Sequence, residues 1–284
     1  MKQVGKVGEV WRYPVKSTRG ERLDACRVGA KGVAGDRGWA VRHDKMGEIQ
    51  SGRQMPKLLQ CTSRYATEPE AEPWPAAWIT TPSGREFSTD DPRAAELLSE
   101  WMGAAVSLWP IQPPEDTAHY RRLPVDLPEL RRQFGREGDE PLPDMNMFPQ
   151  ELMQYIASPG TYFDVQPVHL LTTASLVHMR GLNPGADWAI PRFRPNFVVD
   201  TGDLSGLIEA DWSGKTVRIG EVELSVYSPA PRCANTIHDQ GRDVPKDPSI
   251  LRSIVKHADQ NLGVYCTVLR GGRVKEGDPV SVSD

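Results

Sequence analysis

The chain has 284 residues, a formal net charge of −4 at pH 7, and 38% hydrophobic and 25% charged residues. This size and balance predict a globular protein with a substantial core, folded as one large domain or two of ordinary size. The negative charge argues against a protein that neutralises nucleic-acid phosphates over a broad surface, so we expect no nucleic-acid partner. No window approaches the roughly 18 apolar residues of a membrane span, and the first residues lack a signal-peptide core. We therefore expect no membrane partner and a cytoplasmic location.

Short strands separated by glycine and proline are predicted in the first part of the chain. They cover residues 7–13, 23–28, 39–43 and 58–63. Such punctuation is typical of a β-barrel or sandwich. One helix is predicted between Asp91, which can cap it, and Gly103, which can end it. We predict a β-barrel-like N-terminal domain over residues 1–110.

Residues 111–166 contain many prolines and little periodicity. One short helix is predicted near residues 128–134. Irregular segments of this length are usually lids, linkers or disordered chain. We predict a proline-rich crossover or lid between two halves, and a connector without function is the alternative.

Residues 167–284 return to strands with few helices. The predicted strands cover residues 168–171, 197–199, 222–226 and 264–269, with a hairpin through residues 220–221. We predict a second β-barrel-like domain over residues 167–284. The expected fold class is therefore mainly β with some α, with two β-barrel-like domains packed together.

The four cysteines, Cys26, Cys61, Cys233 and Cys266, form no Cys-x-x-Cys pair. Structural zinc and cysteine-ligated iron–sulfur clusters therefore have no support in the sequence, and we expect no iron–sulfur cluster in this chain. Two local basic clusters, at residues 12–19 and 192–194, could bind a small anion, although a solvated surface is the ordinary explanation.

One cysteine stands out by its context. Residues 222–226 alternate as a half-buried strand does, and Pro229 and Pro231 then end the strand. Arg232 and Cys233 therefore lie on a stiff loop just past a strand end. A thiol beside a guanidinium ionises more readily, which suits one soft metal ligand or one nucleophile. The alternative is that Cys233 is a small buried hydrophobic residue.

Six motifs, in order along nearly the whole chain, resemble those of the molybdenum cofactor sulfurase C-terminal (MOSC) domain family with its N-terminal β-barrel partner domain. They are Tyr13-Pro14-Val15-Lys16-Ser17, Gly35-Asp36-Arg37-Gly38-Trp39, Arg53-Gln54-Met55-Pro56, Arg192-Phe193-Arg194-Pro195-Asn196, Arg232-Cys233 with Thr236, and Gly277-Asp278-Pro279-Val280. Each motif alone is weak, but six in the right order make the resemblance strong.

In that family the cysteine that matches Cys233 is the protein's thiolate ligand of molybdenum, which a pterin dithiolene also holds. A soft, ionised sulfur suits such a metal. The resemblance thus implies a molybdenum cofactor, Mo-molybdopterin, with Cys233 as metal ligand and catalytic residue. The cofactor-binding residues that it implies are Lys16, Ser17, Arg37, Thr172, Arg194, Asn196 and Arg232. As alternatives, Arg37 could form a structural salt bridge with Asp36, and Thr172 could only cap a helix.

The resemblance also implies an oxidoreductase that removes an oxygen atom from the nitrogen of N-hydroxylated small molecules. Some relatives carry an appended ferredoxin-like domain, and we expect none in this sequence, so electrons for a reductase should come from a separate protein or from the substrate. Asp239 is a candidate catalytic proton donor, and His238 is a weaker one. The alternative is a carrier or transferase that delivers the cofactor, or a persulfide sulfur on Cys233, to another enzyme. A hydrolase with Cys233 as nucleophile and His238 as base is less favoured, because no nucleophile elbow accompanies the pair.

Overall fold

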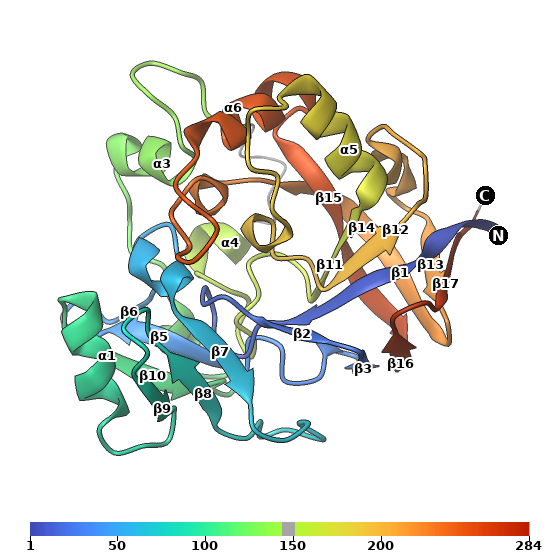
Figure 1. Cartoon of the computed structure of the whole chain (residues 1–284). Coiled ribbons are helices and arrows are strands. Elements are labelled where there is room, and N and C mark those ends of the chain that lie inside the picture. Colours follow the sequence, from blue (N-terminus) through green and yellow to red (C-terminus); the bar gives the residue numbers. More distant parts are fainter. Residues whose placement is uncertain (144–150, 284) are drawn as a thin grey trace.

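The computed structural model describes residues 1–143 and 151–283, and its secondary structure is mostly β, with 32% strand and 21% helix. The predicted mainly β fold class is confirmed. Figure 1 shows a large barrel with smaller sheets beside it and helices around the two.

Seven strands close into a barrel, because β1 pairs with both β17 and β12. In order around the barrel they are β12 (Phe197–Asp200), β11 (Val168–Thr172), β15 (Asn261–Arg270), β14 (Val222–Pro231), β13 (Thr216–Ile219), β17 (Pro279–Val282) and β1 (Lys2–Arg12). The short strand β2 (Glu21–Leu23) pairs with the end of β1. Among these neighbours only β11 and β12 run parallel.

The first strand of the chain completes a barrel whose other strands come from the second half. Lys2 of β1 lies opposite Val282 of β17, and Val10 lies opposite Phe197 of β12. The two ends of the described chain therefore lie side by side at one end of the barrel (Figure 1). The domain boundaries at residues 110 and 166 stay predictions. Wherever they fall, strand pairing joins the beginning and the end of the chain.

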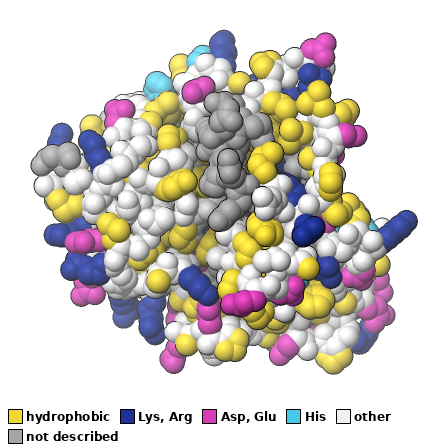
Figure 2. All heavy atoms as spheres, turned by 180° about the vertical axis from the view of Figure 1, so that it is seen from behind, with side chains coloured by type: hydrophobic (Ala, Val, Ile, Leu, Met, Phe, Trp, Pro, Cys, Tyr) yellow, Lys and Arg dark blue, Asp and Glu magenta, His cyan; other side chains and the backbone are white. Residues whose placement is uncertain are grey.

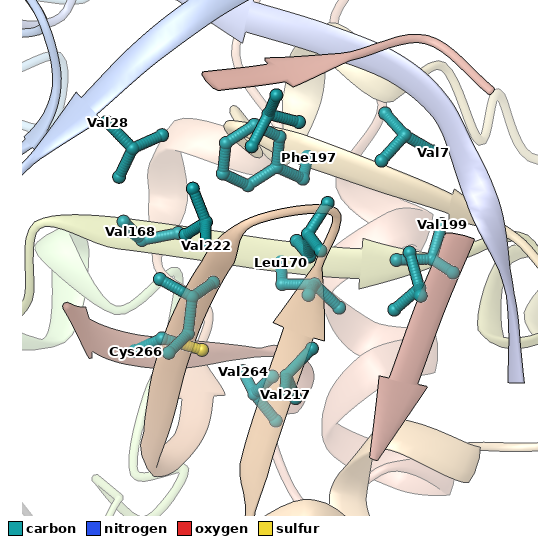
Figure 3. Close-up of a cluster of buried hydrophobic side chains, with 14 of the residues drawn as sticks. Val7, Val28, Val168, Leu170, Phe197, Val199, Val217, Val222, Val264 and Cys266 are labelled. Carbon is teal, nitrogen blue, oxygen red and sulfur yellow. The ribbon is translucent and has the colours of Figure 1, made fainter. Parts of the chain in front are cut away.

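Aliphatic side chains fill the barrel interior. Val7 of β1 and Val199 of β12 come from the two strands that close it, and Leu170, Phe197 and Val264 are also buried there (Figure 3). Inward-facing residues alternate with outward-facing ones along each strand, as in other small barrels. The barrel is thus a packed scaffold rather than a channel.

Two smaller sheets lie beside the barrel and share one hydrophobic core. One contains β10 (Val106–Pro110), β5 (Trp39–His43) and β6 (Glu48–Ile49), and the other contains β7 (Thr62–Tyr65), β8 (Ala77–Thr80) and β9 (Glu86–Ser88). The 3-10 helix η1 (Pro56–Gln60) and α1 (Ala94–Met102) contact each other beside them. A further sheet, of β16 (Gly272–Lys275), β3 (Ala25–Gly29) and β4 (Gly32–Val33), again joins the two ends of the chain.

The predicted helix between Asp91 and Gly103 is confirmed as α1. Gly103 ends it with a left-handed backbone (φ 75°), as glycine commonly does at this position. The N-cap residue is Arg93 rather than Asp91, although the Asp91 carboxylate accepts a 2.7 Å hydrogen bond from the Arg93 N–H.

The described part of the crossover contains three short helices. Residues 144–150 lie outside that part. The helices are α2 (Thr117–Tyr120), α3 (Leu127–Gln133) and α4 (Glu151–Gln154). The short helix predicted near residues 128–134 is confirmed as α3. Asp126 caps it by accepting a 2.8 Å hydrogen bond from the Glu129 N–H. A role as a lid stays a prediction.

Two longer helices cover one side of the barrel (Figure 1). They are α5 (Thr173–Leu182) and α6 (Pro248–His257), and the 3-10 helices η3 (Ile190–Arg192) and η4 (Ile208–Trp212) lie in the connections. Leu176, Phe193, Ile250 and Ile254 form a common core beneath them. This layer holds the segments that flank the predicted site residues near 192–196.

Two features of the described chain bear on the predicted partners. Within residues 1–143 and 151–283, no helix has the length and apolar character needed to cross a membrane. The face in Figure 2 mixes small groups of hydrophobic side chains with lysine, arginine and acidic ones. No broad basic surface covers this face.

Replacing a buried side chain at the barrel closure should destabilise the whole fold. Phe197 is completely buried opposite Val10, so Phe197→Ala should lower the free energy of unfolding by about 3–5 kcal/mol. Leu269→Ala, on the exposed end of β15 with 59% of the residue accessible, should change it by less than about 0.5 kcal/mol. Urea unfolding followed by circular dichroism measures both. Equal midpoints for the two variants would contradict a barrel closed at this seam.

Candidate functional site

The cysteine loop begins where β14 ends, with Pro231 opposite Asn261 of β15. Cys233 has an extended backbone and caps the 3-10 helix η5 (Ala234–Thr236). Thr236 Oγ1 donates a 2.9 Å hydrogen bond to the Cys233 carbonyl oxygen. The backbone is therefore fixed on both sides of the thiol, as the two prolines predicted.

Of the four cysteines, all of which the structure describes, only Cys233 is partly exposed. Burial raises the pKa of the other three thiols to about 12. These thiols belong to Cys26, Cys61 and Cys266. A buried thiol of such high pKa stays protonated at neutral pH and is a poor ligand or nucleophile. The alternative that Cys233 is a fully buried hydrophobic residue is therefore not met, and none of the other three cysteines is placed to do the chemistry predicted for it.

Three of the predicted cofactor-binding residues have a left-handed backbone. The φ angles are 65° at Ser17, 50° at Arg37 and 55° at Arg194. Non-glycine residues keep this costly conformation only where the surrounding structure imposes it, and such residues cluster at functional sites. The first two loops hold each other, since the Arg37 N–H donates a 2.7 Å hydrogen bond to the Tyr13 carbonyl oxygen.

The ring of Tyr13 joins the N-terminal motifs to the motif around residue 194. The Arg37 guanidinium carbon lies 4.5 Å from the ring centroid, and that of Arg194 lies 4.3 Å from it. The Tyr13 hydroxyl donates a 3.0 Å hydrogen bond to the Pro195 carbonyl oxygen. Cation–π contacts of this length are favourable, and more so when buried. Residues predicted from two distant parts of the chain thus meet at one ring.

Two buried guanidiniums lack a carboxylate partner among the described residues. Arg194 donates a 2.5 Å hydrogen bond to the Thr18 carbonyl oxygen, and Arg232 donates one of 2.7 Å to the Phe193 carbonyl oxygen. Burial, and then the neighbouring Arg37, lower the pKa of Arg194 to about 10. The buried Nε of Arg232 has no hydrogen-bond partner. Because burying an unpaired charge is costly, these groups fit an anion that brings the missing counter-charge.

Lys16 is buried and already has a partner. Its Nζ donates hydrogen bonds of 2.6 Å to Asp164 Oδ1 and 2.8 Å to the Tyr162 carbonyl oxygen. Burial lowers the pKa of Lys16, and Asp164 only partly offsets this. For Asp164, burial raises the pKa, but Lys16 and Arg53 outweigh it and lower the pKa below its usual range. This ion pair ties the β1 side of the site to the end of the crossover.

Asp36 is a buried carboxylate that holds several of the predicted residues together. It accepts hydrogen bonds from the Tyr13 N–H at 2.7 Å and from Asn196 Nδ2 at 2.9 Å, and it pairs with Arg37. The structural salt bridge considered for Arg37 is therefore present. It leaves the Arg37 guanidinium against the Tyr13 ring, so pairing with Asp36 and facing the site go together.

A cavity of about 410 Å³ lies in front of the cysteine loop. Cys233, Tyr265 and Asp164 are among the residues that line it, and burial raises the pKa of Tyr265 to about 12, so its phenol is neutral. The rest of the wall is largely apolar and comes mainly from the crossover. It includes Leu123, Pro124, Val125, Leu130, Phe134, Met153 and Val165. This volume and lining are typical of a small-molecule site.

Among the predicted site residues only Cys233 lines this cavity, and two of the others have local roles elsewhere. The Thr172 hydroxyl donates a 2.6 Å hydrogen bond to Glu209 Oε2 and accepts one of 3.1 Å from the Ser175 N–H, which caps α5. Asp239 is exposed and accepts a 2.7 Å hydrogen bond from the Gly241 N–H. The helix-cap alternative for Thr172 is thus realised, and the site roles of Thr172 and Asp239 stay predictions.

The structure adds residues that the sequence did not indicate as functional. Asp164 and Arg122 come from the irregular crossover, where no periodicity marks a position. Tyr265 lies within β15 and is an ordinary strand residue by type. Arg53 belongs to the third of the six motifs, but no role was predicted for it. The signal for all four is spatial, because each lines the cavity that Cys233 lines.

Comparison with known proteins matches both parts of the chain to family models. The MOSC domain model matches residues 158–281, and the MOSC N-terminal beta barrel domain model matches residues 4–73. The chain is 27% identical to mitochondrial amidoxime reducing component 2 of Bos taurus over 99% of its length and 84% of that protein. It is 25% identical to mitochondrial amidoxime-reducing component 1 of Homo sapiens, over 99% and 83% of the two chains.

Among solved structures, the YUAD protein from Bacillus subtilis aligns over 98% of this chain and 94% of its own, at 12% identity and a TM-score of 0.44, values from which no likeness of function follows. The family models, in contrast, match the two halves in which the predicted motifs lie. The chain therefore belongs to the MOSC domain family and carries a MOSC N-terminal beta barrel domain ahead of its MOSC domain.

Proposed function

We propose that this protein binds a molybdenum cofactor through Cys233 and reduces N-hydroxylated small molecules. The observation that carries the proposal is the pair of buried, unpaired guanidiniums of Arg194 and Arg232 beside the one accessible thiol. Relatives at 23–28% identity, named amidoxime reducing components, support the same reaction class.

The residues present fit such a cofactor. A partly exposed thiol on a rigid loop suits a soft protein ligand for the metal. Arg194 and Arg232 would neutralise the cofactor's anionic groups. Lys16, Ser17, Arg37 and Asn196 would hold it from the N-terminal side. When bound, the cofactor supplies the oxygen-atom and electron chemistry.

The chain's own residues prepare the place of reaction. The Cys233 loop, fixed at both ends, holds the cysteine in the cavity wall. Asp164, ionised through its pairing with Lys16, sets a fixed negative charge there, and the neutral Tyr265 offers a hydroxyl group. The apolar wall displaces water from a substrate that enters. Protons for the released water reach the cavity from solvent.

The partners follow from this proposal. The substrate is a small molecule, and a separate protein supplies the electrons. The cytoplasmic location stays a prediction, since the relatives are named mitochondrial proteins.

Removing the thiol should remove the metal while the fold persists. Cys233→Ala should lower the molybdenum-to-protein ratio at least about tenfold, because loss of a ligand costs at least as much as loss of a residue that orients one. Elemental analysis of protein purified from a molybdenum-competent host measures the ratio, and circular dichroism checks the fold. Cys26→Ala, which removes a buried thiol, serves as the matched control. Equal metal content in the two variants would refute the assignment.

The same measurement separates the reductase from the carrier or sulfur transferase. A reductase retains molybdenum through purification and reduces substrate over many turnovers. A carrier releases the cofactor to an acceptor protein, and a persulfide shuttle carries sulfur on Cys233 without stoichiometric metal. Wild-type protein that holds sulfane sulfur but no molybdenum would favour the shuttle.

Neutralising Arg194 should weaken cofactor binding without harming the cofactor-free fold. Loss of a hydrogen bond to a charged group costs about 1.5–3 kcal/mol, so Arg194→Gln should retain the cofactor about 10- to 150-fold less tightly. Because the guanidinium has no carboxylate partner among the described residues, the melting temperature of the cofactor-free protein should stay equal or rise. Pterin fluorescence after denaturation measures retention. The exposed Arg218 provides the control Arg218→Gln. A large drop in cofactor-free stability would show that Arg194 is instead a structural residue.

A further inference from the structure

Two guanidiniums line the cavity in front of Cys233, and neither has an ion-pair partner among the described residues. Arg53 makes one long side-chain hydrogen bond, of 3.4 Å from Nε to Ser51 Oγ. The side chain of Arg122 makes none within residues 1–143 and 151–283, and its Nε is buried without a partner. Burial, and then the neighbouring Arg53, lower the pKa of Arg122 to about 10. The carboxylates of Glu48 and Asp164 offset the repulsion between these two cations only in part, and neither forms an ion pair with them among the described residues, which is a costly arrangement for a cavity wall.

The fold nevertheless holds these two residues in place. The buried Glu48 accepts hydrogen bonds from the Leu123 N–H at 2.7 Å and from Gln54 Nε2 at 3.2 Å, so it fixes the neighbours of both arginines. Arg132 of α3 donates a 2.9 Å hydrogen bond to the Arg53 carbonyl oxygen. Glu48 itself forms no ion pair with Arg122. Glu48 thus positions the segments that carry the two arginines, and their guanidiniums stay without an ion-pair partner among the described residues.

These arginines form a set separate from the cations that the proposed cofactor would use. Lys16, Arg37, Arg194 and Arg232 do not line the cavity, whereas Arg53 and Arg122 do. Arg122 also adjoins the apolar part of the wall in sequence. That part continues from it through Leu123, Pro124 and Val125. A ligand in the cavity would therefore meet two cations, the Asp164 carboxylate that pairs with Lys16, and apolar side chains.

We propose that Arg122 and Arg53 bind an anionic group of the substrate, so that the preferred substrates are N-hydroxylated compounds with an apolar body and a carboxylate. That the substrate is N-hydroxylated rests on the proposed function. That it carries an anionic group rests only on the two arginines. A carboxylate matches the planar, two-pronged donor geometry of a guanidinium. The apolar wall would accept the body of the molecule. The anion could otherwise come from the cofactor's phosphate, and the experiment distinguishes the two sources.

The test compares a benzamidoxime with its 4-carboxylate, and the corresponding amidines as unreactive ligands. With the purified, cofactor-loaded protein, we expect the carboxylate to have the lower KM and the lower Kd. Arg122→Gln should raise both constants at least about tenfold for the carboxylate compounds, the loss of one charge-assisted contact, and should leave the neutral compounds unchanged. Arg122→Lys, which keeps the charge without the fork, should restore part of the difference. Arg121→Gln, an exposed neighbour that does not line the cavity, is the matched control.

Every outcome of this test either supports or overturns the inference. Equal effects of Arg122→Gln on carboxylate and neutral compounds would overturn the inference. A fall in cofactor content of Arg122→Gln, with no change in carboxylate preference, would assign the arginine to the cofactor's phosphate and also overturn it. Calorimetric binding of the amidines needs no turnover. Carboxylate-selective binding without any reduction would therefore refute the proposed function and support the anion site.

Discussion

The site depends on the contact of two guanidiniums with one buried phenol ring. Arg37 and Arg194 both lie within 4.5 Å of the Tyr13 ring centroid, so two like charges share a small, poorly solvated volume. The ring face attracts both cations, and the carboxylate of Asp36 neutralises one of them. The other charge stays unbalanced. The backbone of both arginines is strained. A region with an unbalanced buried cation is suited to binding an anion, whereas an ordinary buried salt bridge is not.

The strand pairing that closes the barrel also brings the site residues together. Tyr13 directly follows β1, and β1 is the strand that closes the barrel against β12. Asn196, which precedes β12, reaches back to Asp36, and the Tyr13 hydroxyl bonds to Pro195. The pairing that seals the hydrophobic core therefore also aligns residues almost two hundred positions apart in the chain. Because a packed barrel resists small deformations, the charges at its edge keep their spacing without a ligand.

The sequence predicted the parts of this structure that local chemistry determines. Prolines around Cys233 predicted a rigid loop at a strand end, and the alternation of residues 222–226 predicted the strand. It did not predict that β1 closes the barrel of the second half, because strand alternation shows which face is buried and not which strand is the neighbour. It also missed Asp164 and Arg122, whose roles arise from where an irregular segment folds back. Thr172 is the opposite case, a residue predicted for the site that caps a helix instead. A hydroxyl at a strand–helix junction can cap the helix or bind a ligand, and its sequence context is the same for both.

The unbalanced charges would couple the binding of an anion, such as the proposed cofactor, to the stability of the folded protein. Without an anion, the folded state carries buried cations that raise its free energy, whereas the unfolded chain exposes them to water. An anion that binds only the folded state stabilises it in proportion to the logarithm of its concentration over Kd. Without carboxylate partners, Arg194 and Arg232 raise the free energy of the folded state. Binding of the anion would lower it again. Supplying acidic partners for these arginines would stabilise the empty protein and weaken its binding of the anion. A site built to hold a large anion firmly is therefore expected to cost the empty fold some stability.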